Sequence, residues 1–183
     1  MKVLSVASEI FPLIKTGGLA DVAGALPAAL KSKGVEMLSL MPGYPAVMAA
    51  LEDAEPIHLY QNLYGGTAGL VRGKAKGLDV IVLDAPHLFD RPGNPYLGPD
   101  GKDWADNGKR FAALSRAASD IGEGKTKGFM PDVLHLHDWQ AALAASNVRY
   151  ADGSTRKPKT LLTVHNIAFQ GNFGAQLFGE LGL

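Results

Sequence analysis

The chain has 183 residues, of which 46% are hydrophobic and 20% charged, the composition of a soluble globular domain with a substantial core. Lysine plus arginine and aspartate plus glutamate both number 18, which argues against a broad surface for nucleic acid or membranes, and we expect neither as a partner. The absence of cysteine excludes disulfides, thiolate zinc sites and cysteine nucleophiles, and it suits the reducing cytoplasm, where we expect the protein to act.

The chain begins with an apolar run that predicts a buried strand over Val3–Ala7. Because the polar residues Ser5, Ser8 and Glu9 interrupt this run, it does not have the pattern of a signal peptide. No segment approaches the ~20 apolar residues that a membrane-spanning helix needs. Similar runs predict parallel strands at Glu36–Met41, Val80–Leu83, Val133–His137 and Thr160–Val164, and weaker runs predict an antiparallel pair at one edge, Ile57–Leu63 and Thr67–Val71.

Helical periodicity occurs between these strands, over Leu19–Lys33, Asp106–Ile121 and Trp139–Tyr150. Pro27 lies inside the first of these segments, so either the helix kinks there or a new helix starts. The segment Asp84–Asp106 is rich in proline and glycine and predicts no regular element; a functional loop and a plain surface connection both remain open.

The alternation of strands and helices predicts one α/β domain over residues 1–183, with a doubly wound, mainly parallel Rossmann-like sheet and helices on both faces. In such sheets ligands bind beyond the carboxyl ends of the strands. Segments rich in polar or conformationally special residues follow three of the predicted strands, namely Ser8–Asp21, Asp138–Gln140 and His165–Gly171. We therefore expect these segments to form the ligand site.

The first of these segments contains the stretch KTGGLADV, in which Lys15 precedes Gly17 and Gly18 and Asp21 follows. The order of residues is not that of a P-loop, where the lysine follows the glycines, nor of a GxGxxG fingerprint. The two glycines allow close backbone approach at a helix N-terminus, which favours anions, and Lys15 adds a charge suited to a phosphate. A glycine turn with a solvated lysine and a structural aspartate is the alternative.

The other two segments contain histidines at strand ends. His135 and His137 point to the same face of a strand, but with Asp138 they supply too few ligands for a closed metal site, and we expect no metal. Asp138 either caps the next helix or accepts hydrogen bonds from sugar hydroxyls. His165 and Asn166 are either structural residues or binding groups for a polar ligand.

Taken together, the motifs resemble a known family. The stretches SEIFPLIKTGGLADVAGALPAAL, PGYP, NPYLG, DNGKRFAALSRAA, HLHDWQAAL and TVHNIAFQG occur in the order and spacing of the N-terminal lobe of bacterial glycogen synthase and plant starch synthase. The resemblance runs from the first strand to the end of the chain. It implies one of two Rossmann-like lobes that face each other across a cleft.

The resemblance also implies an activity. Enzymes of this family transfer glucose from ADP-glucose to the non-reducing 4-hydroxyl of an α-1,4-glucan such as glycogen or a maltooligosaccharide, with retention of configuration and without a metal or other cofactor. The N-terminal lobe binds much of the acceptor, and the C-terminal lobe holds most of the nucleotide and supplies charges for the leaving diphosphate.

Carried over by motif, the resemblance places Lys15, Gly17 and Gly18 near the diphosphate of ADP-glucose. It places Asp21 on the sugar or acceptor side of the cleft, and it associates Tyr96 of the NPYLG motif with donor binding.

The motifs at the later strand ends imply roles near the reacting sugar. Asp138 is expected to accept hydrogen bonds from sugar hydroxyls and His165 to contact the donor glucose, with its backbone carbonyl stabilising an oxocarbenium-like transition state. Asn166 is expected to support this position. Positioning and electrostatics would then do most of the catalytic work.

The chain is much shorter than the enzymes of this family, so we expect it to hold the N-terminal lobe alone, without the C-terminal lobe, and to be inactive by itself. A non-catalytic glucan-binding or regulatory module is the alternative function. A nicotinamide-binding Rossmann domain is disfavoured, because no GxGxxG follows the first strand and no acidic residue ends the second.

Overall fold

The computed structural model describes residues 1–183 and contains a single seven-stranded sheet with the strand order β3-β4-β5-β2-β1-β6-β7. Strands β5, β2, β1, β6 and β7 are parallel, whereas β3 and β4 form antiparallel pairs at one edge. The bounds are β1 Lys2–Val6, β2 Glu36–Pro42, β3 Leu51–Tyr60, β4 Ala68–Ala75, β5 Leu78–Asp84, β6 Val133–His137 and β7 Lys159–Thr163. The predicted parallel strands and the antiparallel edge are confirmed.

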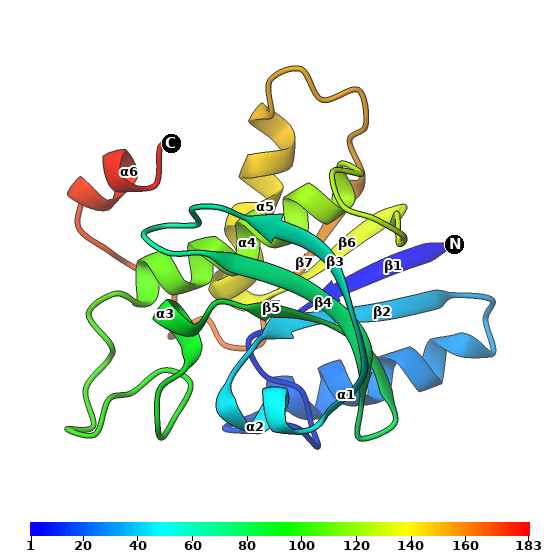
Figure 1. Cartoon of the computed structure of the whole chain (residues 1–183), viewed down its shortest axis with the longest axis horizontal. Coiled ribbons are helices and arrows are strands. Elements are labelled where there is room, and N and C mark those ends of the chain that lie inside the picture. The colour runs from blue at the N-terminus through cyan, green and yellow to red at the C-terminus, as the bar shows by residue number, and fades with distance from the viewer.

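Helices cover both faces of this sheet. They are α1 Gly18–Lys31, α2 Pro45–Ala49, α3 Pro86–Phe89, α4 Asn107–Gly122, α5 Asp138–Tyr150 and α6 Gln176–Glu180. Figure 1 shows α1 on one side of the sheet and α4 and α5 together on the other. Right-handed crossovers explain this arrangement, because the chain moves from β1 to β2 in one direction and from β5 to β7 in the opposite direction. The expected doubly wound α/β fold is confirmed.

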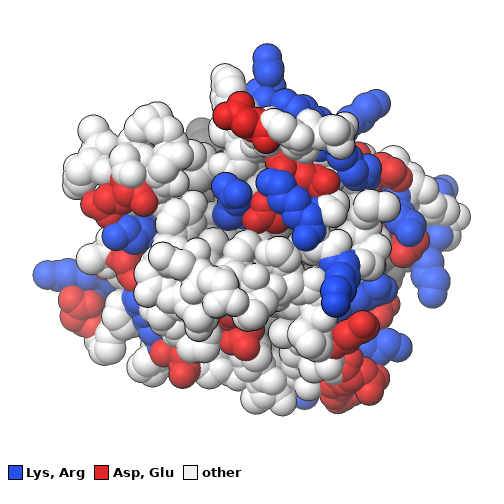
Figure 2. Space-filling view, turned by 45° about the horizontal axis from the view of Figure 1, so that its top comes forward, with Lys and Arg blue, Asp and Glu red and all other residues white.

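The core lies on both faces of the central strands. From Met37 to Pro42 every residue of β2 is buried, as expected of a parallel strand covered by helices on both sides. The outermost strand β7 differs, because its residues Leu161 and Leu162 are about half exposed. No helix combines the length and apolar character needed to cross a membrane. Figure 2 shows basic and acidic side chains interspersed over the face in view.

The structure excludes one alternative left open at Pro27 and corrects one local expectation. Helix α1 continues through Pro27 as one element, so no second helix starts there. The segment Asp84–Asp106, predicted to lack regular structure, contains the single helical turn α3. Pro86 stands in the first turn of α3, where its fixed φ favours a helix, but four residues are too few for a periodic pattern.

Candidate functional site

The predicted site residues gather at the carboxyl edge of the parallel strands. Here the sheet has its topological switch point, because the connection after β1 leads to one side and the connection after β6 leads to the other. Ligands of doubly wound folds bind at such a crevice. The loop after β1, the start of α5 after β6 and the segment after β7 all emerge at this edge.

The loop after β1 folds around a buried carboxylate. Glu9 is only 3% exposed and accepts hydrogen bonds from the backbone N–H of Thr16, from Thr16 Oγ1 at 2.9 Å and from the N–H of Gly17 at 3.3 Å. These bonds fix the backbone that leads into α1. The sequence reasoning did not identify Glu9 as a functional residue. The available signal was a charged residue beside a buried strand, because Ser5, Ser8 and Glu9 are all buried.

Lys15 and Asp21 form an ion pair at the entrance to α1. The Lys15 Nζ lies 2.7 Å from both carboxylate oxygens of Asp21, and both side chains are about half exposed. Gly17 is the N-cap residue and Gly18 the first residue of α1. A Cβ atom added to either glycine would meet nothing within 4 Å. Packing within the chain therefore does not require these glycines, and they leave open space beside the helix N-terminus.

Tyr96 reaches the same loop from the segment between β5 and α4. Its hydroxyl donates to Glu9 Oε1 at 2.9 Å and lies 2.8 Å from Ser8 Oγ. Because the only hydroxyl proton of Tyr96 goes to Glu9, Ser8 is the donor in the second bond. Burial is the largest cause that raises the pKa of Tyr96, and the Glu9 carboxylate adds to it, so the phenol stays a neutral donor.

Buried polar residues of α4 hold the segment that carries Tyr96. The Arg110 guanidinium is 1% exposed and donates to the backbone oxygens of Leu88 at 2.7 Å and Pro95 at 2.8 Å and to Asn107 Oδ1 at 2.6 Å. Asn107 Nδ2 donates to the backbone oxygen of Tyr96 at 2.9 Å. These hydrogen bonds fix the backbone of the segment that carries Tyr96.

Three histidines lie next to one another, two on β6 and one just after β7. His137 is fully buried, and its Nε2 lies 3.1 Å from Ser5 Oγ, while its Nδ1 lies 2.9 Å from His165 Nε2. The His135 ring is tilted by 33° against His137, with ring centroids 4.2 Å apart, and His135 hydrogen-bonds Thr163 Oγ1 at 2.8 Å. Burial, with smaller effects from His135 and His165, lowers the pKa of His137 to about 3. Burial and His165 also lower the pKa of His135. His137 is thus neutral at physiological pH.

Asp138 orients the segment after β7. Its Oδ1 accepts the backbone N–H of His165 at 2.6 Å. Asp138 is the first residue of α5 and makes no capping bond, so the expected N-cap role is wrong. Its φ of 57° lies in the left-handed region, a conformation that costs a non-glycine residue about 1 kcal/mol or more. Asn166 is exposed, and its Oδ1 accepts the N–H of Ala168 at 2.9 Å.

Hydrogen bonds within the chain account for the close approach of His137 and His165. Both ring nitrogens of His137 are engaged, by Ser5 and by His165. Nowhere does the chain bring together three or more histidine, aspartate or glutamate side chains in positions to hold a metal ion.

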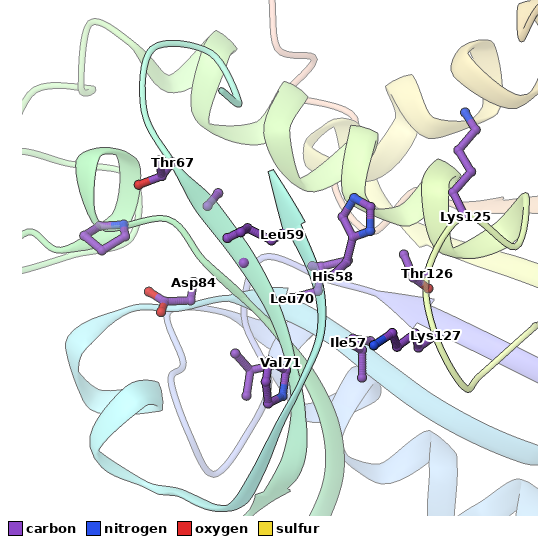
Figure 3. Close-up of a pocket in the computed structure, with 14 residues that line it drawn as sticks. Ile57, His58, Leu59, Thr67, Leu70, Val71, Asp84, Lys125, Thr126 and Lys127 are labelled. Atoms are coloured by element: carbon purple, nitrogen blue, oxygen red, sulfur yellow. The ribbon is translucent and has the colours of Figure 1, made fainter. Parts of the chain in front are cut away.

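A cavity of about 840 Å³ lies elsewhere, at the antiparallel edge of the sheet. Figure 3 shows Ile57, His58 and Leu59 of β3 on one side of it and residues 125–127, which follow α4, on another. None of the predicted site residues lines this cavity. The convergence of polar groups, rather than cavity size, identifies the candidate site.

Comparison with known proteins identifies a family. The family model described as "Starch synthase catalytic domain" matches residues 2–183. A "Glycogen synthase" of Rhodopseudomonas palustris (strain BisB18) is 59% identical over 98% of the chain, and one of Methylocella silvestris is 60% identical over all of it. The chain spans only 36% and 38% of the length of these two relatives.

A solved structure is similar as well. It is the "Catalytic domain of Starch Synthase IV from Arabidopsis thaliana bound to ADP and acarbose", with a TM-score of 0.78, 29% identity, and coverage of 99% of this chain and 37% of that one. The family match along nearly the whole chain and the gathering of its motifs at one sheet edge lead to one assignment: the chain belongs to the starch synthase catalytic domain family.

Proposed function

We propose that the chain forms the N-terminal lobe of a retaining glucosyltransferase, a glycogen synthase that moves glucose from ADP-glucose to the non-reducing 4-hydroxyl of an α-1,4-glucan. One observation carries most of the weight: the open N-terminus of α1, with Lys15 beside it, lies at the same sheet edge as Asp138 and His165. A family member with ADP and acarbose bound supports a nucleotide and a glucan-like sugar as ligands.

In this proposal the loop after β1 receives the diphosphate. The N–H groups of Gly17 and Gly18 and the positive end of the α1 dipole favour an anion, and Lys15 supplies a full charge. Tyr96 forms the neighbouring wall of the donor site. Its hydroxyl is committed to Glu9 and Ser8, so its contribution to the donor comes from the ring and from the loop position.

Asp138, His165 and Asn166 form the sugar side of the site. Asp138 Oδ1 accepts the N–H of His165, and Oδ2 is left to accept a hydrogen bond from a sugar hydroxyl. The same bond fixes the backbone of His165, whose carbonyl oxygen is then a preset dipole for positive charge developing on the donor glucose. Asn166 holds the following turn through Ala168. Asp21 borders the acceptor side. These roles need no metal and no other cofactor.

Completion of the transfer requires groups outside these 183 residues, because the relatives that match are nearly three times as long. We therefore assign the charges that neutralise the leaving diphosphate to a C-terminal lobe. Removal of one such electrostatic group typically lowers turnover by ~10²–10³. The proposed location is the cytoplasm, for which a cysteine-free chain is suited.

Two substitutions in a full-length protein carrying this sequence test the proposal. Lys15→Ala should raise the KM for ADP-glucose about tenfold or more with a smaller effect on kcat, whereas His165→Ala should mainly lower kcat. Lys33→Ala is the control and should change neither constant, because Lys33 is exposed and lies two residues beyond the C-terminal end of α1. An unchanged kcat in the His165 variant would refute its role.

Binding without transfer would identify the alternative module. If the full-length protein binds maltooligosaccharides in a calorimetric titration but neither binds ADP-glucose nor transfers glucose from it, the enzymatic proposal is wrong. Transfer by the 183-residue chain alone, at a rate near that of the full-length protein, would contradict the need for a second lobe.

A further inference from the structure

His137 connects a buried serine of β1 to the edge where ligands are expected. The Ser5 hydroxyl lies 3.1 Å from His137 Nε2, and His137 Nδ1 lies 2.9 Å from His165 Nε2. Ser5 and His137 are both fully buried, whereas His165 is partly exposed. The three side chains thus form one continuous line of hydrogen bonds from the core to the surface.

The buried end of this line determines the direction of its hydrogen bonds. Ser5 has no hydrogen-bond partner other than His137. If Ser5 accepted from an Nε2–H group, its own proton would be left unpaired in the core, which is unfavourable. Ser5 therefore donates to His137 Nε2. Neutral His137 then carries its proton on Nδ1 and donates it to His165 Nε2.

The surroundings of His137 keep its ring neutral, as this direction requires. Burial lowers its pKa to about 3, and the rings of His135 and His165 act in the same direction. Measured between centroids, the tilted His135 ring lies 4.2 Å from the His137 ring, and the stacked His165 ring lies 5.2 Å from it. A neutral ring with one proton can donate at only one nitrogen.

We propose that Ser5, acting through His137, fixes His165 in the tautomer that carries its proton on Nδ1, so that His165 offers a hydrogen-bond donor to a sugar hydroxyl. The sugar contact rests on the proposed function. Within the chain, His165 Nδ1 makes no hydrogen bond, which leaves it for a ligand, while Asp138 holds the backbone N–H of the same residue. Ser5 and His137 are positioning residues, because they act only through His165.

The neighbouring strand supplies a matched control for Ser5. Ser39 of β2 is the register partner of Ser5 and is equally buried, but its hydroxyl has no hydrogen-bond partner. Ser39→Ala therefore removes a buried hydroxyl from the same layer of the sheet without touching the line of hydrogen bonds. Ser5→Ala removes the donor that sets its direction.

The test is a two-dimensional 1H–15N spectrum of the ¹⁵N-histidine-labelled chain at pH 8, where an unperturbed histidine is neutral. Protonated and unprotonated ring nitrogens separate in such a spectrum. The chain has five histidines, so His58→Gln and His87→Gln variants help to assign the signals. We expect both His137 and His165 to be protonated at Nδ1 and unprotonated at Nε2.

In Ser5→Ala the ratio of the two tautomers at His165 should shift by about fivefold toward the Nε2-protonated form, the effect of one ordinary hydrogen bond. Ser39→Ala should leave the ratio unchanged. Protonation of His165 at Nε2 in the unaltered chain would overturn the proposal, and this reading needs no variant to fold. A Ser5→Ala spectrum identical to the unaltered one would overturn the role of Ser5.

A titration of the labelled full-length protein with ADP-glucose separates this inference from the proposed function. Movement of the His165 Nδ1 signal on binding supports the sugar contact. Binding that leaves the Nδ1 signal in place overturns that contact, and an absence of binding overturns the proposed function, whereas the tautomer is read in the unliganded protein in either case.

Discussion

Glu9 is a buried carboxylate that accepts hydrogen bonds from Thr16, Gly17 and Tyr96. In Glu9→Gln the new amide group would face backbone donors that need an acceptor. We expect the free energy of unfolding to fall by about 1–3 kcal/mol, because buried donors would lose their partner. Urea denaturation followed by circular dichroism measures this change.

Glu36→Gln provides the matched control for Glu9. The Glu36 side chain is about half exposed, and its one ion pair is a 3.9 Å contact with Lys2. Exposed pairs of this kind contribute little, so the free energy of unfolding should change by no more than about 0.5 kcal/mol. Equal losses in the two variants would contradict the role assigned to Glu9.

His137 makes stability depend on pH in a defined direction. Its pKa is about 3 in the folded chain, below the ~6.5 of an unperturbed histidine, so between these values the unfolded chain binds more protons. The free energy of unfolding therefore has its full value, as far as His137 affects it, above pH 6.5, and it falls as the pH is lowered toward 3. Between pH 8 and pH 5 this one group should lower it by about 2 kcal/mol. The lowered pKa of His135 acts in the same direction.

The measurement for His137 is the free energy of unfolding in urea at pH 8 and pH 5. In His137→Gln the decrease between the two pH values should be smaller by about the contribution of this one group. The comparison within each variant removes any general loss of stability that the substitution causes. An unchanged decrease would show that His137 is not held neutral by the fold.

Sequence reasoning predicted which residues meet at the carboxyl edge of the sheet but not the hydrogen bonds that hold them there. The proximity of Asp138 and His165 was predictable because parallel strands end at one edge, a rule that needs only the order of elements. Ser5 was not assigned a role, because its partner His137 lies 132 residues away along the chain, and the contact of Glu9 with Tyr96 spans 87 residues. Local patterns cannot identify a hydrogen bond between distant strands.

At the scale of the element, the glycines of α1 differ in what the fold requires of them. A Cβ atom at Gly24 would lie 2.2 Å from the backbone oxygen of Phe11, whereas one at Gly17 would meet nothing. Gly24→Ala should therefore lower stability by about 1–3 kcal/mol, and Gly17→Ala should lower it by less, about 1 kcal/mol or below, because alanine is only a poorer N-cap than glycine. Thermal denaturation distinguishes the two variants.

For ligand binding, we expect Gly17 to matter more than Gly24. If a diphosphate approaches the N-terminus of α1, a methyl group at Gly17 should weaken ADP-glucose binding by the full-length protein with only a small loss of stability. Gly17→Ala with unchanged affinity would argue against a ligand at this position. A large loss of stability in that variant would show that the chain itself needs the glycine.

Strands and helices could be predicted from the sequence where they bury an apolar face, and less well where the chain is exposed. The five parallel strands follow apolar runs, and their predicted and observed bounds agree closely. Strand β3 starts at Leu51, earlier than predicted, because Glu52–Pro56 is exposed and has no apolar alternation. Helices α2 and α6, each of five residues, were too short for a periodic pattern.

At the scale of the whole molecule, the two edges of the sheet differ in their protection. Strand β3 carries the charged residues Glu52, Asp53 and Glu55, and the N–H of Lys127 bonds to the backbone oxygen of Ile57. Strand β7 pairs only with β6 and exposes apolar side chains. Natural proteins protect edge strands with charges or covering segments, so β7 is the edge more prone to association.

We expect the 183-residue chain to self-associate in a concentration-dependent way through β7. Leu162→Lys places a charge on that strand and should lower the association constant about tenfold or more in sedimentation equilibrium. Leu59→Lys, at a 64% exposed leucine of β3, is the control and should have little effect. A larger effect of the β3 substitution would show that the charged edge is the one that associates.

In the ion pair between Lys15 and Asp21, the carboxylate of Asp21 competes with any anion that binds to Lys15. A diphosphate at this position would not meet a free ammonium group but would have to replace a carboxylate six residues further along the chain. Because both partners are about half exposed, opening the pair costs little. The contribution of Lys15 to substrate binding is then the difference between the free energies of two ion pairs, one with the substrate and one with Asp21. Because salt weakens both pairs, it should lower this contribution less than it would for a lysine without a partner.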